Sequence, residues 1–335
     1  MSGVRHLTVS EDDDGQRLDR WLKRHVPEIP YILLQKLLRQ GQMRVDGKRA
    51  KPEMRLKAGQ DIRIPPVKER GRPDGKPALS HEETAFIRSL VVYDDGEVLA
   101  LNKPAGLAVQ GGTNTRRHID GMLDALVNKK GVRPRLVHRL DKDTSGVLLL
   151  ARSAETARKL GDLFKGREIK KIYWAICSPA PAQLEGTIKA PLVKAGGPDK
   201  EKMVVDEEEG KIAVTDFVVL ERAMDSAAFV AFWPRTGRTH QIRVHAQLMG
   251  ASILGDHKYK AVRNPESKKP EADLGALGLS RRLYLHARRL ILPHPLRKGH
   301  VLDITAPLPP ELAAGWKALG FDPSYKADPF EDAKP

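Results

Sequence analysis

Carboxylate and hydroxyl side chains gather in one short polar loop between two apolar runs of the chain. The loop follows Leu136–Val137 and precedes the continuous apolar run Val147–Ala151. A continuous run of branched residues with such boundaries is typical of a strand buried on both faces. Asp141 lies in this loop between a cation and an apolar wall, and we interpret it as a catalytic carboxylate.

Two simpler interpretations of the loop stay open. Asp141, Asp143 and Ser145 could be turn residues whose side chains bond to the nearby backbone. The spacing Asp141-x-Asp143-x-Ser145-Gly146 also opens like an EF-hand loop, which needs a bidentate Glu at its twelfth position. That position is Arg152 and the residues before it are apolar, so the sequence disfavours a calcium loop.

The loop is part of a longer pattern that resembles the signatures of the RluA-type pseudouridine synthases. The motifs occur in the order typical of that family: His138-Arg139-Leu140-Asp141-x-Asp143-Thr144-Ser145-Gly146, Lys171-x-Tyr173-x-Ala175, and Gly237-Arg238-Thr239-His240-Gln241-Ile242-Arg243-Val244-His245. The resemblance covers almost the whole chain. It implies an isomerase that converts specific uridines of large-subunit (23S) ribosomal RNA to pseudouridine.

The resemblance also implies a role for each candidate site residue. Asp141 would be the catalytic carboxylate, and Arg243 would pair with it and favour its ionised form. Tyr173 would stack on the uracil, and Ile242 would close the other face of the base. Arg139 would fill the gap left by the flipped-out uridine. Asp141 could act as a nucleophile or abstract a sugar proton to give a glycal, and the sequence does not choose between these routes.

The implied reaction needs no cofactor and no metal. It breaks the N1–C1′ bond, rotates the base and joins C5 to C1′, so nothing is oxidised and no group enters or leaves. His240 and His245 are five residues apart, which is not the spacing of a zinc-binding helix pair. Cys177 is the single cysteine, which excludes an intrachain disulfide, a cysteine-rich zinc site and the Cys-x-x-Cys signature of RNA-acting cytidine deaminases.

The charge of the chain indicates a polyanionic partner. The 335 residues carry a formal net charge of +15, and Arg17 to Ile64 has 13 Lys or Arg and 5 Asp or Glu, a net charge of +8. This segment also resembles an S4 RNA-binding domain, in the pattern Arg17-Leu18-Asp19 … Arg39-x-Gly41 … Val45-x-Gly47. The RNA contacts expected there are Arg17, Lys36, Arg39, Arg44, Lys48 and Arg49. A solvated helix face is the simpler alternative for these charges.

The same composition restricts compartment and class. No apolar run approaches the ~20 residues of a membrane-spanning helix, and the N-terminus lacks the apolar region of a signal peptide. We therefore expect a cytoplasmic protein that does not bind membranes and acts as a monomer. A non-catalytic RNA-binding ribosome assembly factor would explain the charge equally well, but not the combination of Asp141, Tyr173 and Arg243.

The predicted strands and helices that position these residues indicate an α+β protein, with a largely antiparallel central sheet flanked by helices. We expect an S4 domain at 16–64, a flexible linker at 65–87, a catalytic domain at 88–320 and a disordered tail at 321–335, with 1–15 also lacking fixed structure. Helices are predicted over 16–26, 31–40, 118–128 and 309–319, another is N-capped by Ser153, and one begins near Thr239; strands are predicted over 43–45, 62–64, 98–101, 147–151, 171–176, 215–220, 228–233 and 283–292. Residues 256–282 are expected to form a flexible loop.

Overall fold

The computed structural model describes residues 3–26, 28–67, 79–112, 115, 117–166, 168–196, 202–260 and 272–331, apart from the side chains of Asp12 and Ile32. The chain divides into two compact units, Met1–Ala78 and Leu79–Pro335. Each unit has its own sheet and its own hydrophobic core. Much of the predicted linker, 68–78, lies outside the described residues.

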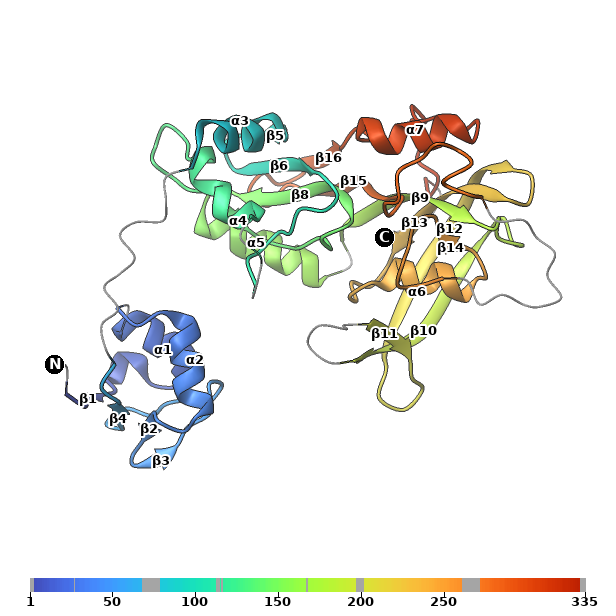
Figure 1. The fold of residues 1–335 in the computed structure, drawn as a ribbon. Helices are drawn as coiled ribbons and strands as arrows, with labels where there is room; N and C mark the ends of the chain where they lie inside the picture. Colours follow the sequence, from blue (N-terminus) through green and yellow to red (C-terminus); the bar gives the residue numbers. More distant parts are fainter. Residues whose placement is uncertain are drawn as a thin grey trace. The chain divides into compact units, whose positions relative to one another are not determined.

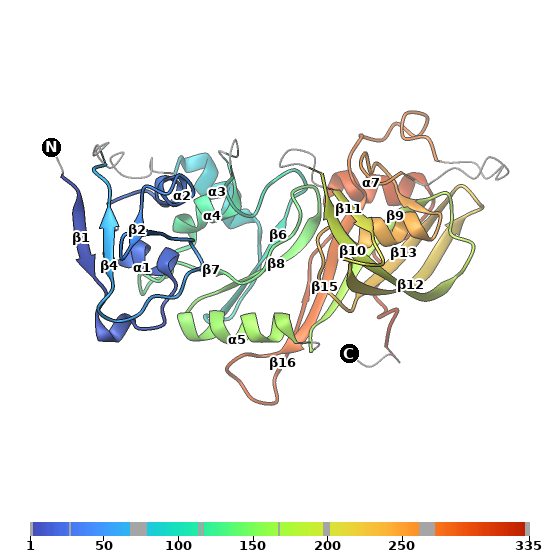
Figure 2. The same ribbon diagram turned by 90° about the horizontal axis from the view of Figure 1, so that it is seen from below.

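The first unit packs two helices against a small antiparallel sheet with the strand order β1-β4-β2-β3 (Figures 1 and 2). Its elements are β1 (Arg5–Thr8), the 3-10 helix η1 (Glu11–Asp13), α1 (Leu18–His25), α2 (Tyr31–Arg39), β2 (Arg44–Val45), β3 (Lys48–Arg49) and β4 (Asp61–Ile64). The predicted helices and strands of this segment are present within one or two residues of their expected ends.

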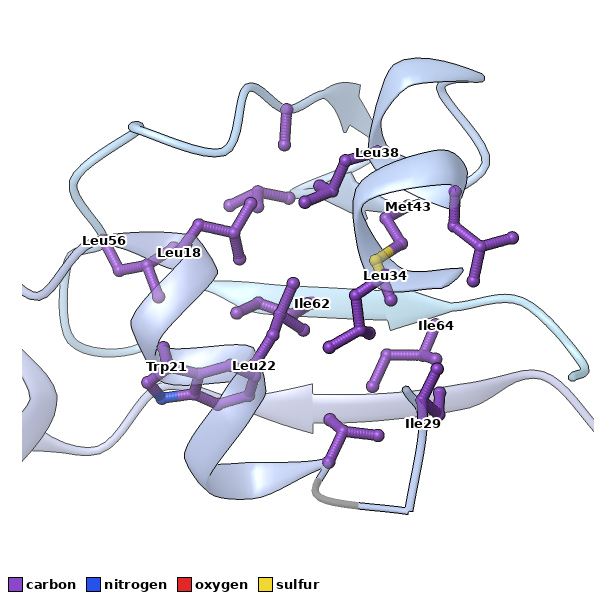
Figure 3. Packing of buried hydrophobic residues seen from close by; sticks show 14 of the residues in the cluster. Leu18, Trp21, Leu22, Ile29, Leu34, Leu38, Met43, Leu56, Ile62 and Ile64 are labelled. Carbon is purple, nitrogen blue, oxygen red and sulfur yellow. The ribbon is translucent and has the colours of Figure 1, made fainter. Parts of the chain in front are cut away.

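Apolar residues at helical spacing on α1 form the centre of this unit's core. Leu18, Trp21 and Leu22 are fully buried and pack with α2 residues such as Leu34 over Ile62 of β4 (Figure 3). The spacing of three and four residues places these side chains on one face of the helix that the sequence predicted over 16–26.

The segment before α1 is more ordered than expected. Strand β1 pairs with β4, and Val9 is buried in the core. The carboxylate of Asp13 is also buried and accepts hydrogen bonds from Trp21 Nε1 (3.1 Å) and Ser10 Oγ (3.0 Å). The expectation that residues 1–15 lack fixed structure is therefore wrong for most of this segment, because Val9 and Asp13 complete the core of the unit.

The second unit is built on one large mixed sheet, which runs through the ribbon from β5 to β11 (Figure 1). Its elements are α3 (His81–Ser89), β5 (Val91–Asp94), β6 (Val98–Lys103), α4 (Ile119–Met122), the 3-10 helix η2 (Leu123–Leu126), β7 (Arg135–Leu136), β8 (Ser145–Ala151), α5 (Ala154–Lys165), β9 (Lys170–Ser178), β10 (Glu185–Ala195), β11 (Lys202–Val205), β12 (Lys211–Ala223), β13 (Ala227–Pro234), α6 (Gln241–Leu248), β14 (Ser252–Ile253), β15 (Leu285–Pro293), β16 (Val301–Thr305) and α7 (Pro310–Ala318).

The order of strands confirms the α+β class with a largely antiparallel sheet. The strands follow one another as β11-β10-β12-β13-β9-β15-β8-β6-β5, with β14 beside β9, β16 beside β15 and β7 beside β8. Among the named strands of the described ranges, β15 and β8 are the one parallel pair, in register at His286 and Ser145. The two halves of the sheet therefore meet where the predicted catalytic loop enters β8.

Strand β8 is buried on both faces, as its continuous apolar run predicted. Leu148 and Leu150 pack with Ile87 of α3 and with the residues of α4 and η2. Val147 and Leu149 pack on the opposite face with Leu160 of α5. Figure 2 shows α3 and α4 on one side of β6 and β8 and α5 on the other. The strand that follows the catalytic loop is thereby fixed by packing from both layers.

Two predicted boundaries of the catalytic domain are wrong. Helix α3 begins at His81 within the expected linker, where Ser80 and Glu83 form a capping box and Ile87 is fully buried. The expected disordered tail packs on the sheet as far as residue 331, because Phe321 and Phe330 fill the core beside β9 and β13. Residues 332–335 lie outside the described residues.

Two other expectations need smaller corrections. The helix predicted over 118–128 is shorter and divides into α4 and η2. Within the predicted flexible loop 256–282, Asp256 and Tyr259 are buried, while 261–271 lie outside the described residues. None of the helices in the described ranges has the length and apolar content needed to cross a bilayer.

Candidate active site

A buried lysine holds the loop that carries Asp141 through hydrogen bonds to its backbone. Lys103 is fully buried at the end of β6, and its Nζ donates to the carbonyl oxygens of Lys142 (3.0 Å), Leu107 (2.8 Å) and Pro104 (2.9 Å). Burial lowers the pKa of Lys103 to about 7, although Asp143 and Asp141 oppose this shift. Lys103 is therefore a structural residue of this loop and not a surface cation.

The end of the loop is fixed by a close approach of two strands. Gly146 has φ +117°, and a Cβ atom there would lie 2.2 Å from the carbonyl oxygen of Ala287 on β15. Beside it, the Ser145 hydroxyl lies 2.8 Å from Nδ1 of the buried His286. Ser145 and Gly146 therefore serve the parallel pairing of β8 with β15, which sets the position of Asp141 four residues earlier.

Tyr173 extends from the middle of the sheet to the loop that carries Asp141. It lies on β9, opposite Phe232 of β13 on one side and Ala287 of β15 on the other. Burial raises the pKa of the Tyr173 hydroxyl, and the nearby charge of Asp141 adds to this shift. The phenol is therefore neutral in the neutral pH range.

The start of α6 is fixed by Gln241. Its Nε2 donates to the Val214 carbonyl oxygen (2.9 Å) and to Thr215 Oγ1 (2.8 Å), and its Oε1 accepts from the Arg238 backbone N–H (3.0 Å). These bonds join the turn before α6 to strand β12. Ile242, the next residue, is 7% exposed.

All five substrate-site residues predicted from the sequence line one cavity of about 140 Å³. They come from the loop before β8, from β9 and from α6: Arg139, Asp141, Tyr173, Ile242 and Arg243. The cavity is completed by other residues of the motifs and of the neighbouring strands, namely Leu140, Thr144, Lys171, Pro234, Thr236, Gly237, Arg238, His240, Gln241 and Leu285. The folded chain therefore brings together residues that are a hundred positions apart in the sequence.

Arg243 differs from expectation in its partner. Its Nε and Nη2 donate to Oδ2 and Oδ1 of Asp256, each at 2.6 Å, and the two side chains are 3% and 0% exposed. The direct ionic partner of Arg243 in this structure is therefore Asp256 and not the expected Asp141. Burial alone would lower the pKa of Arg243. The hydrogen bonds and charge of Asp256 raise the pKa of Arg243 above its usual value, and the charge of Asp141 adds a smaller contribution in the same direction. Arg243 thus acts on Asp141 through space.

Asp256 is a site residue that the sequence did not reveal. Its Oδ1 also accepts the backbone N–H groups of Lys258 (2.8 Å) and Tyr259 (3.1 Å). Asp256 lies in a polar, irregular stretch without periodicity, and this pattern predicted only a loop. The short turn Gly255-Asp256-x-x-Tyr259 directly follows the apolar residues Ile253 and Leu254, and this pattern could have indicated an ordered turn.

The histidines of the motifs each have a partner within the protein. His138 Nε2 accepts the Leu149 backbone N–H (2.8 Å), and His245 Nδ1 lies 2.8 Å from the Thr215 hydroxyl. His240 Nδ1 lies 2.8 Å from the Tyr259 hydroxyl. In the described part of the chain, no group of three or more His, Cys, Asp or Glu side chains is placed to hold a metal ion.

A second, wider cavity of about 600 Å³ opens beside the first and shares Asp141 and Tyr173 with it. Its described lining contains Asp141 as its one carboxylate and several cations: Arg139, Lys142, Lys171, Arg238 and Lys258. Three of these cations, Arg139, Lys171 and Arg238, line both cavities. Burial lowers the pKa of Lys171. An electropositive cleft of this kind favours a phosphate-bearing chain.

The cations predicted to bind RNA in the first unit are all exposed: Arg17, Lys36, Arg39, Arg44, Lys48 and Arg49. Three of them are oriented by the protein. Arg49 Nη2 donates to the Arg39 carbonyl oxygen (2.5 Å), and Arg44 Nη1 donates to that of Gly47 (2.9 Å), while Arg17 pairs with Asp19 (2.8 Å). The end of α2 and the β2–β3 hairpin therefore present fixed positive charge.

Comparison with known proteins agrees with this arrangement. The family model for RNA pseudouridylate synthases matches residues 97–248, and that for the S4 domain matches residues 16–62. Ribosomal large subunit pseudouridine synthase C of Salmonella typhimurium is 36% identical over 310 residues, which cover 91% of this chain and 93% of the relative. The protein of the same name from Pasteurella multocida is 36% identical over 314 residues, covering 92% of each chain.

Solved structures give the same result for the catalytic unit. Human RNA Pseudouridylate Synthase Domain Containing 4 is similar with a TM-score of 0.58 and 31% identity over 72% of this chain and 98% of the human chain. The resemblance inferred from the three motifs and from the N-terminal pattern is confirmed. With its S4 domain and its shared catalytic domain, the chain belongs to the RNA pseudouridylate synthase family.

Proposed function

We propose that this protein isomerises uridines of large-subunit ribosomal RNA to pseudouridine, with Asp141 as the catalytic carboxylate. The observation that carries the proposal is the single cavity of about 140 Å³ shared by Asp141, Tyr173 and Ile242. The relatives over nine-tenths of the chain are named for the large ribosomal subunit, which supports this choice of RNA.

The lining of the cavity suits a flat, uncharged base. Tyr173 offers an aromatic ring and Ile242 an apolar side chain, so a uracil can bind between a stacking surface and an apolar wall. Asp141 lies at the border of this cavity and the cationic cleft, where the sugar of the same nucleotide would reach. Its carboxylate could attack C1′ or remove a sugar proton, and both routes need it ionised.

The charge of the wider cleft suits the backbone of the substrate. A uridine that enters the small cavity must leave its stack, and its phosphates would then follow the cations around the opening. Arg139 is exposed at this opening and is placed to occupy the space that the base leaves. The S4 domain would add phosphate contacts through its exposed cations, which increase affinity without reading sequence.

The alternative is a ribosome assembly factor that binds RNA without catalysis. Such a protein would need the exposed cations of the first unit, but not a buried Arg243–Asp256 pair beside a carboxylate in a base-sized cavity. We also expect the protein to act in the cytoplasm. We expect it to act as a monomer, because all five predicted site residues come from one chain.

The test is to map pseudouridines in large-subunit ribosomal RNA from a strain that lacks this protein. Specific pseudouridines should disappear, return with the wild-type protein, and stay absent with Asp141→Asn. If the set of pseudouridines were unchanged while ribosome assembly became defective, the assembly factor would be the better interpretation.

A further inference from the structure

His240 holds an unusual position at the start of α6. Its backbone has φ +51° in the left-handed region, which costs free energy for a residue other than glycine. Its imidazole contacts the ring of Tyr259 edge-on at a centroid distance of 5.5 Å. Nε2 of the same ring lies 4.0 Å from Oδ2 of Asp141. The strained backbone therefore places this imidazole between Tyr259 and the carboxylate.

The contact with Tyr259 favours one of the two neutral tautomers of His240. The Tyr259 side chain is fully buried, and its hydroxyl oxygen accepts the backbone N–H of Met203 at 2.8 Å. With that acceptor role filled, the hydroxyl proton can point to His240 Nδ1, 2.8 Å away. In this arrangement Nδ1 accepts, and the ring proton of the neutral imidazole lies on Nε2, the atom that faces Asp141.

The surroundings keep this imidazole neutral. Burial lowers the pKa of His240, and the charges of Arg243 and Lys258 act in the same direction, while Asp141 and Asp256 oppose them. Among the described residues, the charged or titratable groups near the ring come from four elements: the loop before β8, β9, α6 with the turn before it, and the turn after β14. They are His138, Arg139, Asp141, Lys142, Lys171, Tyr173, Arg238, Arg243, Asp256, Lys258 and Tyr259.

We propose that His240, oriented by Tyr259, is a positioning residue that donates its Nε2–H to Oδ2 of Asp141 when substrate is bound. The separation of 4.0 Å is longer than a hydrogen bond, and such contacts often shorten in the substrate complex. A neutral donor orients one carboxylate oxygen and favours the ionised form, yet leaves more negative charge on the other oxygen than a cation would. The inference rests on Asp141 being the catalytic carboxylate.

The test compares His240→Ala with His240→Gln in the full-length enzyme. Alanine and glutamine carry a similar backbone cost in the left-handed region, but only glutamine keeps an amide N–H near the position of Nε2. We expect His240→Ala to lower kcat roughly 10- to 100-fold, the loss of a hydrogen bond to a charged group, with little change in KM. The acidic limb of its kcat/KM–pH profile should move to higher pH. His240→Gln should recover most of the rate and the profile.

Tyr259→Phe provides an independent test, because it removes the hydroxyl and leaves His240 in place. It should lower kcat less than His240→Ala does and broaden the acidic limb, since the ring proton is then free to move to Nδ1. If His240→Ala does not fold, as judged by its thermal transition, this variant decides. A rate and pH profile of His240→Ala equal to those of wild type would overturn the proposal. Where His240→Ala does not fold, a rate and profile of Tyr259→Phe equal to those of wild type would overturn it.

The failure of this inference can be told from failure of the proposed function. An inactive Asp141→Asn enzyme beside a His240→Ala enzyme with the wild-type pH profile would remove only the positioning role of His240. An active Asp141→Asn enzyme would remove the catalytic carboxylate and, with it, the group that His240 is proposed to orient.

Discussion

The buried pair of Arg243 and Asp256 predicts a large effect from a very small change. Asp256→Asn keeps the size and shape of the side chain, but removes its charge and one acceptor oxygen. The guanidinium of Arg243 would stay 3% exposed, without a partner of opposite charge beside it. An uncompensated buried charge typically costs about 3–5 kcal/mol, so we expect a loss of that size in the free energy of unfolding.

The chain contains a matched control for this prediction. Arg289 and Asp303 form a second two-bond pair on β15 and β16, at 2.7 and 2.5 Å, but their side chains are 25% and 45% exposed. Water can replace the lost partner there, so Asp303→Asn should cost no more than about 1 kcal/mol. The two variants differ in burial while sharing the same chemistry.

Differential scanning calorimetry of the full-length protein measures both variants. With about 2–4 °C of Tm per kcal/mol for a domain of this size, Asp256→Asn should lower the transition of the catalytic unit by roughly 6–20 °C. Asp303→Asn should lower it by at most about 4 °C. Equal shifts in the two variants would refute the reasoning, since burial would then not decide the cost of breaking the pair.

Three further changes test the account at other places. Removing residues 1–78, up to the start of the second compact unit, should leave a folded catalytic unit whose RNA affinity falls and whose salt dependence flattens; unchanged binding and salt slope would exclude the S4 role. Gly146→Ala should prevent native folding, because its Cβ would lie 2.2 Å from the Ala287 oxygen. Gly161→Ala lies in α5 with open space around it, and it should raise the free energy of unfolding in chemical denaturation by about 0.5–1 kcal/mol. A loss of stability in both variants would contradict this contrast. Arg139→Ala should slow modification of structured RNA more than of a short unstructured strand, and equal slowing of both would argue against its role in replacing the flipped base.

The parts of the fold that follow from local pattern could be predicted from the sequence. The helical spacing of Leu18, Trp21 and Leu22 gave the buried face of α1, and the unbroken run 147–151 gave a strand buried on both faces. The motifs indicated five residues that line one cavity, because each motif lies in or beside an element that the pattern also predicts.

The parts that depend on contacts between distant segments could not. Asp256 looks like a loop residue until α6 places Arg243 against it, and its neighbours Gly255 and Tyr259 indicate at most an ordered turn. Phe321 and Phe330 are isolated apolar residues in a polar tail, and only the surface beside β9 and β13 gives them a place to pack. Helix α3 is a different case, since Ser80-x-x-Glu83 is a capping-box pattern that was visible in the sequence.

The most direct test of the central claim is the rate of pseudouridine formation by Asp141→Asn on large-subunit ribosomal RNA. The substitution keeps the shape of the side chain and removes the charge that either route requires. The account predicts that turnover falls by at least about 10³-fold while RNA binding stays close to that of wild type. An Asp141→Asn enzyme that forms pseudouridine at a rate near wild type would contradict it.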